Sequence, residues 1–338
     1  MPLVEARDLT KVFRRPDRAP GLAAAVKHLF QRRFTHHTAV DHVNLSIEAG
    51  EAVAYVGPNG AGKSTTVKLL SGILEPTEGE VQIGGRVPQR NRRAVAHEIG
   101  VLFGQRTQLW WDLPVADSLA LLRDLYGVDR ATYQRRLSDL DGVLGIGEFL
   151  GTVGRKLSLG QRMRADLAAA LIHGPRVLYL DEPTIGLDLT VKDRVREFLR
   201  GLRDDGVTVM LTSHDLADIE GFCKRLVIID AGRIIFDGAL EAVKDEFARE
   251  RVLHIRTAAP ADIEPVRAAL PGASVTAADN ATAISVRFDR FTYTAGQVVT
   301  AASAVAELID FQVDEPSIED VIRRVYSGEL LLGREAPA

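Results

Sequence analysis

A glycine-rich loop carrying one lysine occupies residues 57–65, with the sequence Gly-Pro-Asn-Gly-Ala-Gly-Lys-Ser-Thr. Its spacing fits G-x-x-x-x-G-K-[ST], in which backbone N–H groups converge on phosphate oxygens at the start of a helix. Lys63 is then placed to reach the β- and γ-phosphates, and the Ser64 hydroxyl to complete the ligand shell of Mg²⁺. The alternative is a glycine-rich turn with a solvated lysine. We expect the phosphate-binding residues to be Gly57, Pro58, Asn59, Gly60, Ala61, Gly62, Lys63, Ser64 and Thr65.

Two adjacent carboxylates, Asp181 and Glu182, follow the apolar run 177–180. Ligands of open α/β sheets bind at the carboxyl ends of the strands, which is where this pair would lie. Asp181 is placed to hold Mg²⁺ through water, and Glu182 to act as general base on an attacking water. A solvated pair at the start of a loop is the alternative, but the phosphate loop upstream favours the functional interpretation.

The elements that would position these residues are predicted by hydrophobic patterning. Short apolar runs without polar alternation, typical of strands buried on both faces, alternate with helical patterns up to about residue 240. The runs are 52–56, 177–180, 207–211 and 226–229, and a helical pattern over 64–74 follows the phosphate loop. The fold class expected for residues 1–240 is α/β, with a parallel sheet.

Beyond residue 240 the pattern changes. Residues 284–289 alternate strictly between apolar and polar, which indicates a strand with one solvated face. The order expected over 251–315 is strand, helix, strand, strand, helix, strand, a ferredoxin-like α+β arrangement. The sequence therefore predicts a second, smaller domain over 241–338.

Composition argues against several classes of protein. The 338 residues carry a formal charge of -4, whereas nucleic-acid binders normally have a basic footprint. The single cysteine, Cys223, excludes a disulfide within the chain and a cysteine-cluster metal site. We found neither a signal peptide nor an apolar run of about 18 residues, the length of a membrane span, and so expect a soluble protein from a reducing compartment.

A basic segment lies near the N-terminus. Residues 14–34 hold six basic residues and one acidic residue, with apolar residues at helical spacing. We expect a basic amphipathic helix, inserted between two strands at about residues 14–38. It would rest on anionic lipid headgroups or a membrane partner, or else remain a solvated helix packed on its own domain.

Taken in order, these motifs resemble those of the ATP-binding subunits of ATP-binding-cassette (ABC) transporters. The segment 157–161, which we call the signature segment, has the sequence Leu-Ser-Leu-Gly-Gln and is similar to that family's Leu-Ser-Gly-Gly-Gln. Gln105 matches the family's glutamine loop, residues 185–188 match the loop after the catalytic carboxylate, and His214 matches its switch histidine. The resemblance covers residues 3–238 and implies a P-loop ABC-type ATPase domain with a parallel-sheet core and an antiparallel β subdomain.

The resemblance also implies roles for these residues. Two chains would sandwich two ATP molecules, with Ser158, Gly160 and Gln161 of one chain facing the γ-phosphate bound by the other. Asp188 would steady the facing subunit. Glu182, His214 and Gln105 would be the catalytic residues, and Ser64, Gln105 and Asp181 would serve Mg²⁺.

Two features depart from the family pattern. Leu159 replaces the usual first glycine of the signature segment, which is compatible with amide binding provided its φ is negative. Phe13 is the first choice for the aromatic residue that stacks on adenine, Phe34 is a substitute, and plain core packing is the alternative for both.

The resemblance extends to bacterial exporter-type subunits that work with separately encoded permeases. The markers are Leu-Trp-Trp-Asp-Leu-Pro at 109–114 and Glu-Pro-Ser-Ile-Glu-Asp at 315–320. It implies an ATPase held by its permease at the cytoplasmic face of the inner membrane, driving export of drugs, antibiotics, lipids or related molecules. A second ATP-binding subunit, in a homodimer, and the permease are the expected partners, and nucleic acid is not one. The alternative function is that of a non-transport cassette ATPase acting on nucleic acid or ribosomes.

Overall fold

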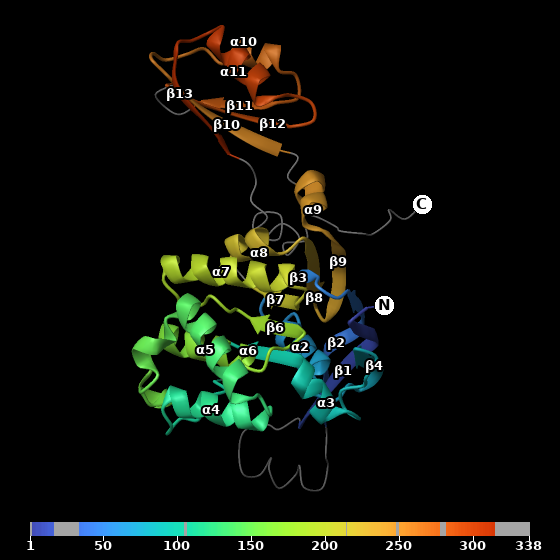
Figure 1. The fold of residues 1–338 in the computed structure, drawn as a ribbon. Coiled ribbons are helices and arrows are strands. Elements are labelled where there is room, and N and C mark those ends of the chain that lie inside the picture. The colour runs from blue at the N-terminus through green and yellow to red at the C-terminus, as the bar shows by residue number, and fades with distance from the viewer. Residues whose placement is uncertain are drawn as a thin grey trace, which may run out of the picture. The chain divides into compact units, whose positions relative to one another are not determined.

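The computed structural model describes residues 2–16, 34–104, 107–213, 215–247, 250–277 and 282–314. Contacts divide the chain into two units, Met1–Asp237 and Gly238–Ala338, both drawn in Figure 1. Each unit is described by itself. The division lies close to residue 240, where the hydrophobic pattern changes.

A six-stranded sheet forms the centre of the first unit, with the strand order β5-β6-β7-β3-β8-β9. Its pairs β5–β6, β6–β7, β3–β7 and β3–β8 are parallel. The predicted apolar runs are its strands β3, β6, β7 and β8, so the prediction of a parallel sheet is confirmed. The strand bounds are β3 Ala52–Val56, β5 Ile99–Phe103, β6 Val177–Asp181, β7 Thr208–Thr212, β8 Arg225–Asp230 and β9 Arg233–Ala239.

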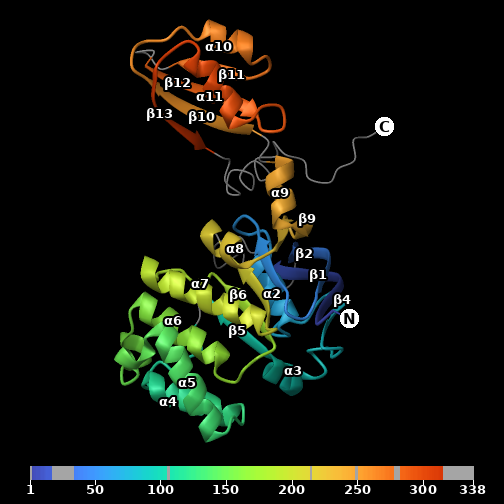
Figure 2. The same cartoon turned by 45° about the horizontal axis from the view of Figure 1, so that its top comes forward.

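Helices surround this sheet. In Figures 1 and 2, the group α4–α6 lies on the opposite side of the first unit from strands β1, β2 and β4. The helix bounds are α2 Lys63–Leu70, α3 Arg92–Glu98, α4 Val115–Leu125, α5 Arg130–Leu144, α6 Leu159–Leu171, α7 Leu189–Asp204 and α8 Leu216–Phe222, with short 3₁₀ turns at Ile146–Phe149 and Gly154–Lys156. Among the described helices, none combines the length and the apolar character needed to cross a membrane.

A three-stranded antiparallel sheet, in the order β2-β1-β4, provides the expected antiparallel subdomain. Its strands are β1 Val4–Pro16, β2 Phe34–Ile47 and β4 Glu78–Ile83. The predicted helical insert at 14–38 is wrong at both ends, because cross-strand pairing continues there and places Arg14 opposite His36 and Pro16 opposite Phe34. The rest of that basic segment, 17–33, lies outside the described residues.

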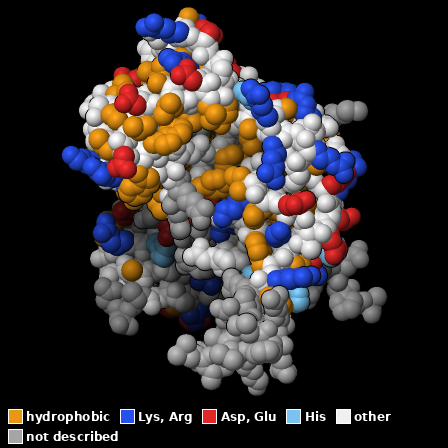
Figure 3. Space-filling view, turned by 90° about the horizontal axis from the view of Figure 1, so that it is seen from below, with side chains coloured by type: hydrophobic (Ala, Val, Ile, Leu, Met, Phe, Trp, Pro, Cys, Tyr) orange, Lys and Arg blue, Asp and Glu red, His pale blue; other side chains and the backbone are white. Residues whose placement is uncertain are grey.

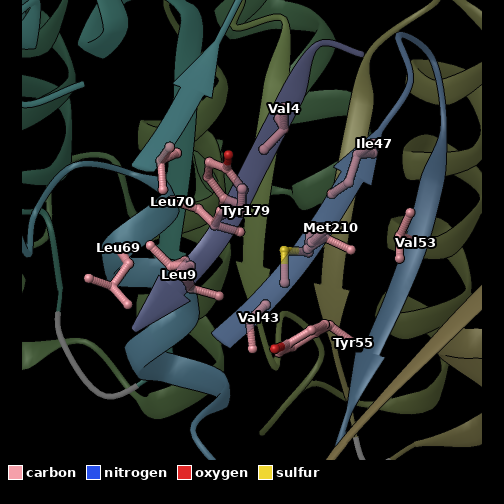
Figure 4. Close-up of a cluster of buried hydrophobic side chains, with 14 of the residues drawn as sticks. Val4, Leu9, Val43, Ile47, Val53, Tyr55, Leu69, Leu70, Tyr179 and Met210 are labelled. Atoms are coloured by element: carbon pink, nitrogen blue, oxygen red, sulfur yellow. The ribbon is translucent and has the colours of Figure 1, made fainter. Parts of the chain in front are cut away.

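The main hydrophobic core joins both sheets to the helix after the phosphate loop (Figure 4). Leu69 and Leu70 on α2 are fully buried in it. Burying one such side chain stabilises the fold by about 1.5–3 kcal/mol, so α2 is anchored against the sheet. The start of α2, which carries Lys63 and Ser64, is thereby held beside the carboxyl ends of the strands. The labelled residues come from β1, β2, β3, α2, β6 and β7: Val4, Leu9, Val43, Ile47, Val53, Tyr55, Leu69, Leu70, Tyr179 and Met210.

The second unit has its own core beneath a four-stranded antiparallel sheet with the order β11-β12-β10-β13. After α9, its elements follow the predicted order of strand, helix, strand, strand, helix, strand. The bounds are α9 Leu240–Phe247, β10 Glu250–Thr257, α10 Glu264–Ala269, β11 Ser274–Ala277, β12 Ala283–Asp289, α11 Ala295–Ser303 and β13 Leu308–Asp314. Residues 315–338, including the motif at 315–320, lie outside the described residues.

Candidate functional site

A pocket of about 560 Å³ in the first unit gathers most of the predicted phosphate loop together with the predicted carboxylates. Phe13, His37 and Ala39 from β1 and β2 also line it. Segments far apart in the sequence therefore meet at one place, at the carboxyl ends of β3 and β6. The other lining residues are Pro58, Asn59, Gly60, Gly62, Lys63, Ser64, Thr65, Lys68, Phe103, Gly104, Asp181, Glu182 and Ile185.

The phosphate loop needs its glycines because backbone from other segments approaches it closely. A Cβ on Gly57 would lie 2.3 Å from the Ile229 carbonyl oxygen, and one on Gly62 would lie 2.4 Å from that of Ala39. Gly62 also has a φ of 111°, a conformation that L side chains rarely adopt. A side chain at either position would push the loop out of place.

Lys63 lies inside this loop. Its Nζ donates hydrogen bonds to the carbonyl oxygens of Gly57 and Pro58, the latter at 3.1 Å. Burial lowers the pKa of Lys63, although the carboxylates of Asp181 and Glu182 favour its charged form. The ammonium group is thus held at the mouth of the loop, where phosphate charge would be neutralised.

Asp181 is fixed through both of its carboxylate oxygens. Ser64 Oγ donates to Oδ2 at 3.0 Å, and Thr212 Oγ1 at the end of β7 donates to Oδ1. This brings together Ser64 and Asp181, the two described members of the predicted metal set. Hydroxyl and carboxylate oxygens are the hard ligands that Mg²⁺ prefers, so the donor set fits this ion.

Glu182 adopts a left-handed backbone conformation, with a φ of 54°. Its N–H donates to the Thr212 carbonyl at 2.9 Å, and its own carbonyl accepts from Ile185 N–H at 3.3 Å. For a non-glycine residue this conformation costs about 1–3 kcal/mol and is concentrated at functional sites. The bend places Glu182 on the pocket wall next to Asp181.

The signature segment does not line this pocket. Ser158 caps α6 by accepting a hydrogen bond from Gln161 N–H at 3.2 Å, while Gln161 Oε1 accepts from Ser158 N–H at 3.0 Å. Leu159 opens α6 without a positive φ, the condition that a leucine requires there. The structure therefore separates Ser158, Gly160 and Gln161 from the phosphate loop of the same chain.

The loop after Glu182 contacts the signature segment. A Cβ on Gly160 would lie 2.8 Å from the Gly186 carbonyl oxygen, so only glycine permits this approach. Asp188 ends the loop and caps α7, accepting from Val191 N–H at 3.0 Å. Its side chain thus has a structural role within its own chain, besides the intersubunit role expected for it.

A buried charge cluster behind the site was missed by the sequence analysis. Asp218 on α8 is 2% exposed and accepts hydrogen bonds from Thr184 Oγ1 at 2.5 Å, Ser213 Oγ at 3.0 Å and Arg196 Nε at 2.7 Å. Arg196 also reaches Asp215 at 3.2 Å. These partners are up to 34 residues apart, and no short motif marks them. The cluster ties the loop after Glu182 to the end of β7.

Two predicted catalytic residues, Gln105 and His214, lie outside the described residues. Their neighbours are placed: Gly104 lines the pocket, and Ser213 takes part in the buried charge cluster. Of the two candidates for adenine stacking, Phe13 lines the pocket, and Phe34 lies at the start of β2 opposite Pro16.

The fold and the site define a P-loop ATPase of the cassette type, and comparisons with known proteins agree. The family model described as ABC transporter matches residues 40–185. The chain belongs to the ABC transporter family, as an ATP-binding subunit that hydrolyses ATP and uses Mg²⁺.

The similar proteins include both a drug-resistance subunit and an import subunit. The chain is 34% identical over 217 residues to the ABC transporter ATP-binding protein NatA of Bacillus subtilis (strain 168), covering 64% of this chain and 88% of that protein. It is 30% identical over 286 residues to the daunorubicin/doxorubicin resistance ATP-binding protein DrrA of Streptomyces peucetius, covering 84% of this chain and 86% of DrrA. It is also 34% identical over 218 residues to the methionine import ATP-binding protein MetN of Geobacillus kaustophilus (strain HTA426), covering 63% of this chain and 64% of MetN.

Solved structures support the same fold. An ATP-binding subunit of an ABC transporter matches with a TM-score of 0.61 and 26% identity, over 72% of this chain and 93% of that one. The ATP-binding cassette MJ0796, in a dimeric post-hydrolysis state bound to ADP and Pi, matches with a TM-score of 0.58 and 26% identity. The match covers 70% of this chain and 98% of MJ0796.

Proposed function

We propose that this chain is the motor subunit of an exporter, in which two cassettes close on ATP and drive a separate membrane permease. The ATPase assignment is carried by one observation: Lys63, Ser64, Asp181 and Glu182 surround a single pocket. The exporter assignment is supported by the lengths over which the relatives align with this chain.

The matches to drug-resistance relatives are longer than those to importers. DrrA aligns over 286 residues and the linearmycin resistance protein LnrL of Bacillus subtilis (strain 168) over 296, although the first unit ends at residue 237. Those alignments must therefore include part of the second unit. The importers MetN and CysA 2 align over 218 and 212 residues, which the first unit alone can accommodate. The second unit thus favours the exporter class.

In the proposed mechanism, the loop amides and Lys63 bind the β- and γ-phosphates of ATP, and Phe13 stacks on the base. Ser64, Asp181 and Gln105 would hold Mg²⁺, which would supply positive charge against the phosphate oxygens. Glu182 orients the attacking water and accepts its proton.

The second half of each site would come from the other subunit. Since Ser158, Gly160 and Gln161 lie apart from the pocket of their own chain, they are available at a helix N-terminus for the γ-phosphate bound by a partner. Asp188 would steady that partner, and His214, which lies outside the described residues, would contact the γ-phosphate. Closure of two copies would then complete both sites.

The permease would dock near Trp110 and Trp111, which are 43% and 56% exposed. They precede α4, at the lower end of the first unit in Figure 1. Figure 3 shows the molecule from below, and hydrophobic side chains gather on this face. Aromatic anchors of this kind suit the centre of an interface. Docking there, aided by the basic segment, would hold the chain at the cytoplasmic face of the membrane.

A pull-down tests this function. A tagged Glu182→Gln chain, expected to bind ATP but to hydrolyse it about 10²–10⁴-fold more slowly, is incubated with detergent-solubilised native membranes and Mg-ATP. Recovery of a polytopic membrane protein at about one per cassette would support the motor. The matched control is Glu182→Gln with Lys63→Ala, which should lose ATP-dependent recovery. Recovery of only soluble or nucleic-acid-associated proteins would overturn the transport proposal in favour of a non-transport cassette ATPase.

A further inference from the structure

A buried carboxylate on α6 holds the segment 107–111, which follows Gln105. Asp166 is 4% exposed, and its Oδ1 accepts a hydrogen bond from Thr107 Oγ1 at 2.8 Å and another from Gln108 N–H at 2.7 Å. Thr107 Oγ1 in turn accepts from Leu109 N–H at 3.1 Å. The carboxylate thus organises the turn that leads into the tryptophans.

A second contact joins the same two elements. The guanidinium of Arg162 lies 5.3 Å from the centre of the Trp111 ring, within the range of a cation–π interaction. Arg162 and Asp166 are four residues apart on α6 and therefore share one face of the helix. Helix α6 thus contacts the segment 107–111 at two places. The contact of Asp166 is polar and buried, and the contact of Arg162 with Trp111 is half-exposed.

Keeping a carboxylate at this position is costly. Burial raises the pKa of Asp166 to about 6, even though the hydrogen bonds from Gln108 and Thr107 and the charge of Arg162 favour its ionised form. Without the carboxylate, the Gln108 N–H would lose its acceptor. Asp166 lies on the helix that Ser158 caps and therefore links that end of α6 to the tryptophans.

We propose that Asp166 is a positioning residue that couples the signature segment to Trp110 and Trp111, so that ATP-driven movement of α6 is transmitted to this pair. The inference rests on the proposed function, because it assumes that ATP closes the site at the start of α6. It adds a specific mechanical link through a side chain that touches neither the nucleotide pocket nor the exposed tryptophan face.

The chain carries its own reporter of this link. Trp110 and Trp111 are its two tryptophans, so fluorescence excited selectively in tryptophan reports on this segment alone. In the Glu182→Gln chain, Mg-ATP is expected to produce a saturable shift in the tryptophan emission maximum. Adding Asp166→Asn, which keeps an oxygen acceptor, should preserve the shift. Adding Asp166→Leu should abolish it while ATP binding, measured by equilibrium dialysis with labelled nucleotide, is retained.

Two further variants keep the test decisive. Thr107→Val removes one donor from the other end of the link without changing α6, and should reduce the shift even if Asp166→Leu does not fold. Asp139→Asn, at an exposed carboxylate on neighbouring α5, is the matched control and should leave the shift intact.

The proposal is overturned if the Glu182→Gln chain binds Mg-ATP with no change in emission. It is equally overturned if Asp166→Leu or Thr107→Val binds ATP and shows the full shift. If the Glu182→Gln chain itself binds no ATP, the proposed function fails and this inference falls with it. The separate binding measurement distinguishes that case.

Discussion

Leu159 packs directly on Gly186. A Cβ built on Gly186 would lie 2.8 Å from both Cγ and Cδ2 of Leu159, so the leucine occupies the space that a side chain at 186 would need. The leucine that departs from the family pattern is 53% exposed, yet its inner side contacts the loop between Glu182 and Asp188. The contact joins the start of α6 to the loop after Glu182, the carboxylate that we propose to be catalytic.

This contact predicts that Gly186→Ala will be harmful for two separable reasons. The alanine would sit at a φ of 74°, which costs about 1–2 kcal/mol, and its Cβ would clash with Leu159. We expect ATP turnover to fall at least about tenfold, equivalent to about 1.4 kcal/mol in the barrier. Adding Leu159→Ala removes the clash but not the strain, so the double variant should recover part of the loss. A strictly additive double variant would show that the contact does not matter.

Adenine stacking should depend on Phe13. Because Phe13 lines the pocket, Phe13→Ala is expected to weaken ATP binding by about 1–3 kcal/mol, the range measured for base–aromatic stacking. Phe34→Ala is the matched control and should leave the Kd near that of the parent. Isothermal titration with ATP on the Glu182→Gln background measures both. A larger effect at residue 34 would reverse the assignment.

The buried charge cluster should support both stability and turnover. Asp218→Asn leaves Arg196 without one buried partner, and breaking a buried pair in this way costs about 3–5 kcal/mol of unfolding free energy. Asparagine replaces one carboxylate oxygen with an NH₂ donor. If the remaining oxygen stays with Arg196, Thr184 Oγ1 and Ser213 Oγ lose the Oδ2 acceptor that they share. The loop two residues after Glu182 would then be less well held, so hydrolysis should fall in the molecules that remain folded. Denaturant unfolding and turnover per folded molecule measure the two effects.

The control uses the same arginine. Arg196 also pairs with Asp193, whose side chain is 66% exposed, and surface pairs contribute about 0–1 kcal/mol. Asp193→Asn should therefore leave stability and turnover nearly unchanged. Equal losses at 193 and 218 would contradict the role given to the buried cluster.

His173 should limit stability in acid. Its Nε2 donates to the Ile99 carbonyl at 2.9 Å, and its ring stacks on Tyr126 with centroids 4.0 Å apart. Its Nδ1 is buried and has no hydrogen-bond partner among the residues that the structure describes. Burial lowers its pKa from 6.5 to about 4. Because the folded-state pKa lies below that of the unfolded chain, stability is full above about pH 6.5 and is lost as the pH falls toward about 4.

When the pH is lowered from about 7 to about 5, this residue should lower the free energy of unfolding by about 2 kcal/mol. His173→Gln should remove that part of the pH dependence, whereas His36→Gln, at an exposed histidine on β2, should retain it. Urea unfolding at the two pH values provides the measurement. Identical pH dependence in the parent and His173→Gln would rule out this explanation.

Sequence information was strongest where a few consecutive residues carry both the structure and the chemistry. The phosphate loop follows β3 directly, and Asp181 and Glu182 stand at the carboxyl end of β6, so local pattern predicted both and placed them at the same edge of the sheet. Leu159 could also be assessed in advance, because the allowed sign of its φ depends only on local sterics.

Contacts between distant segments could not be predicted in this way. Thr184 and Asp218 are 34 residues apart, and Thr107 and Asp166 are 59 apart. Nothing in either local sequence indicates the partner. The ends of β1 and β2 were missed for a related reason. Arg14 and Arg15 were counted with the basic segment, and only the pairing of residues 14–16 with residues 34–36 makes these ends strands.

Strand order also determines when the nucleotide pocket can form during protein synthesis. Strand β7 lies between β3 and β6 although it follows both in the chain. The sheet therefore cannot join Ser64 to Asp181, 117 residues away, until Thr212 has emerged from the ribosome. A ligand stabilises only the state that binds it, so ATP cannot assist any shorter nascent chain. Until then β3 and β6 lack their shared neighbour, and their exposed edges must be protected by other means.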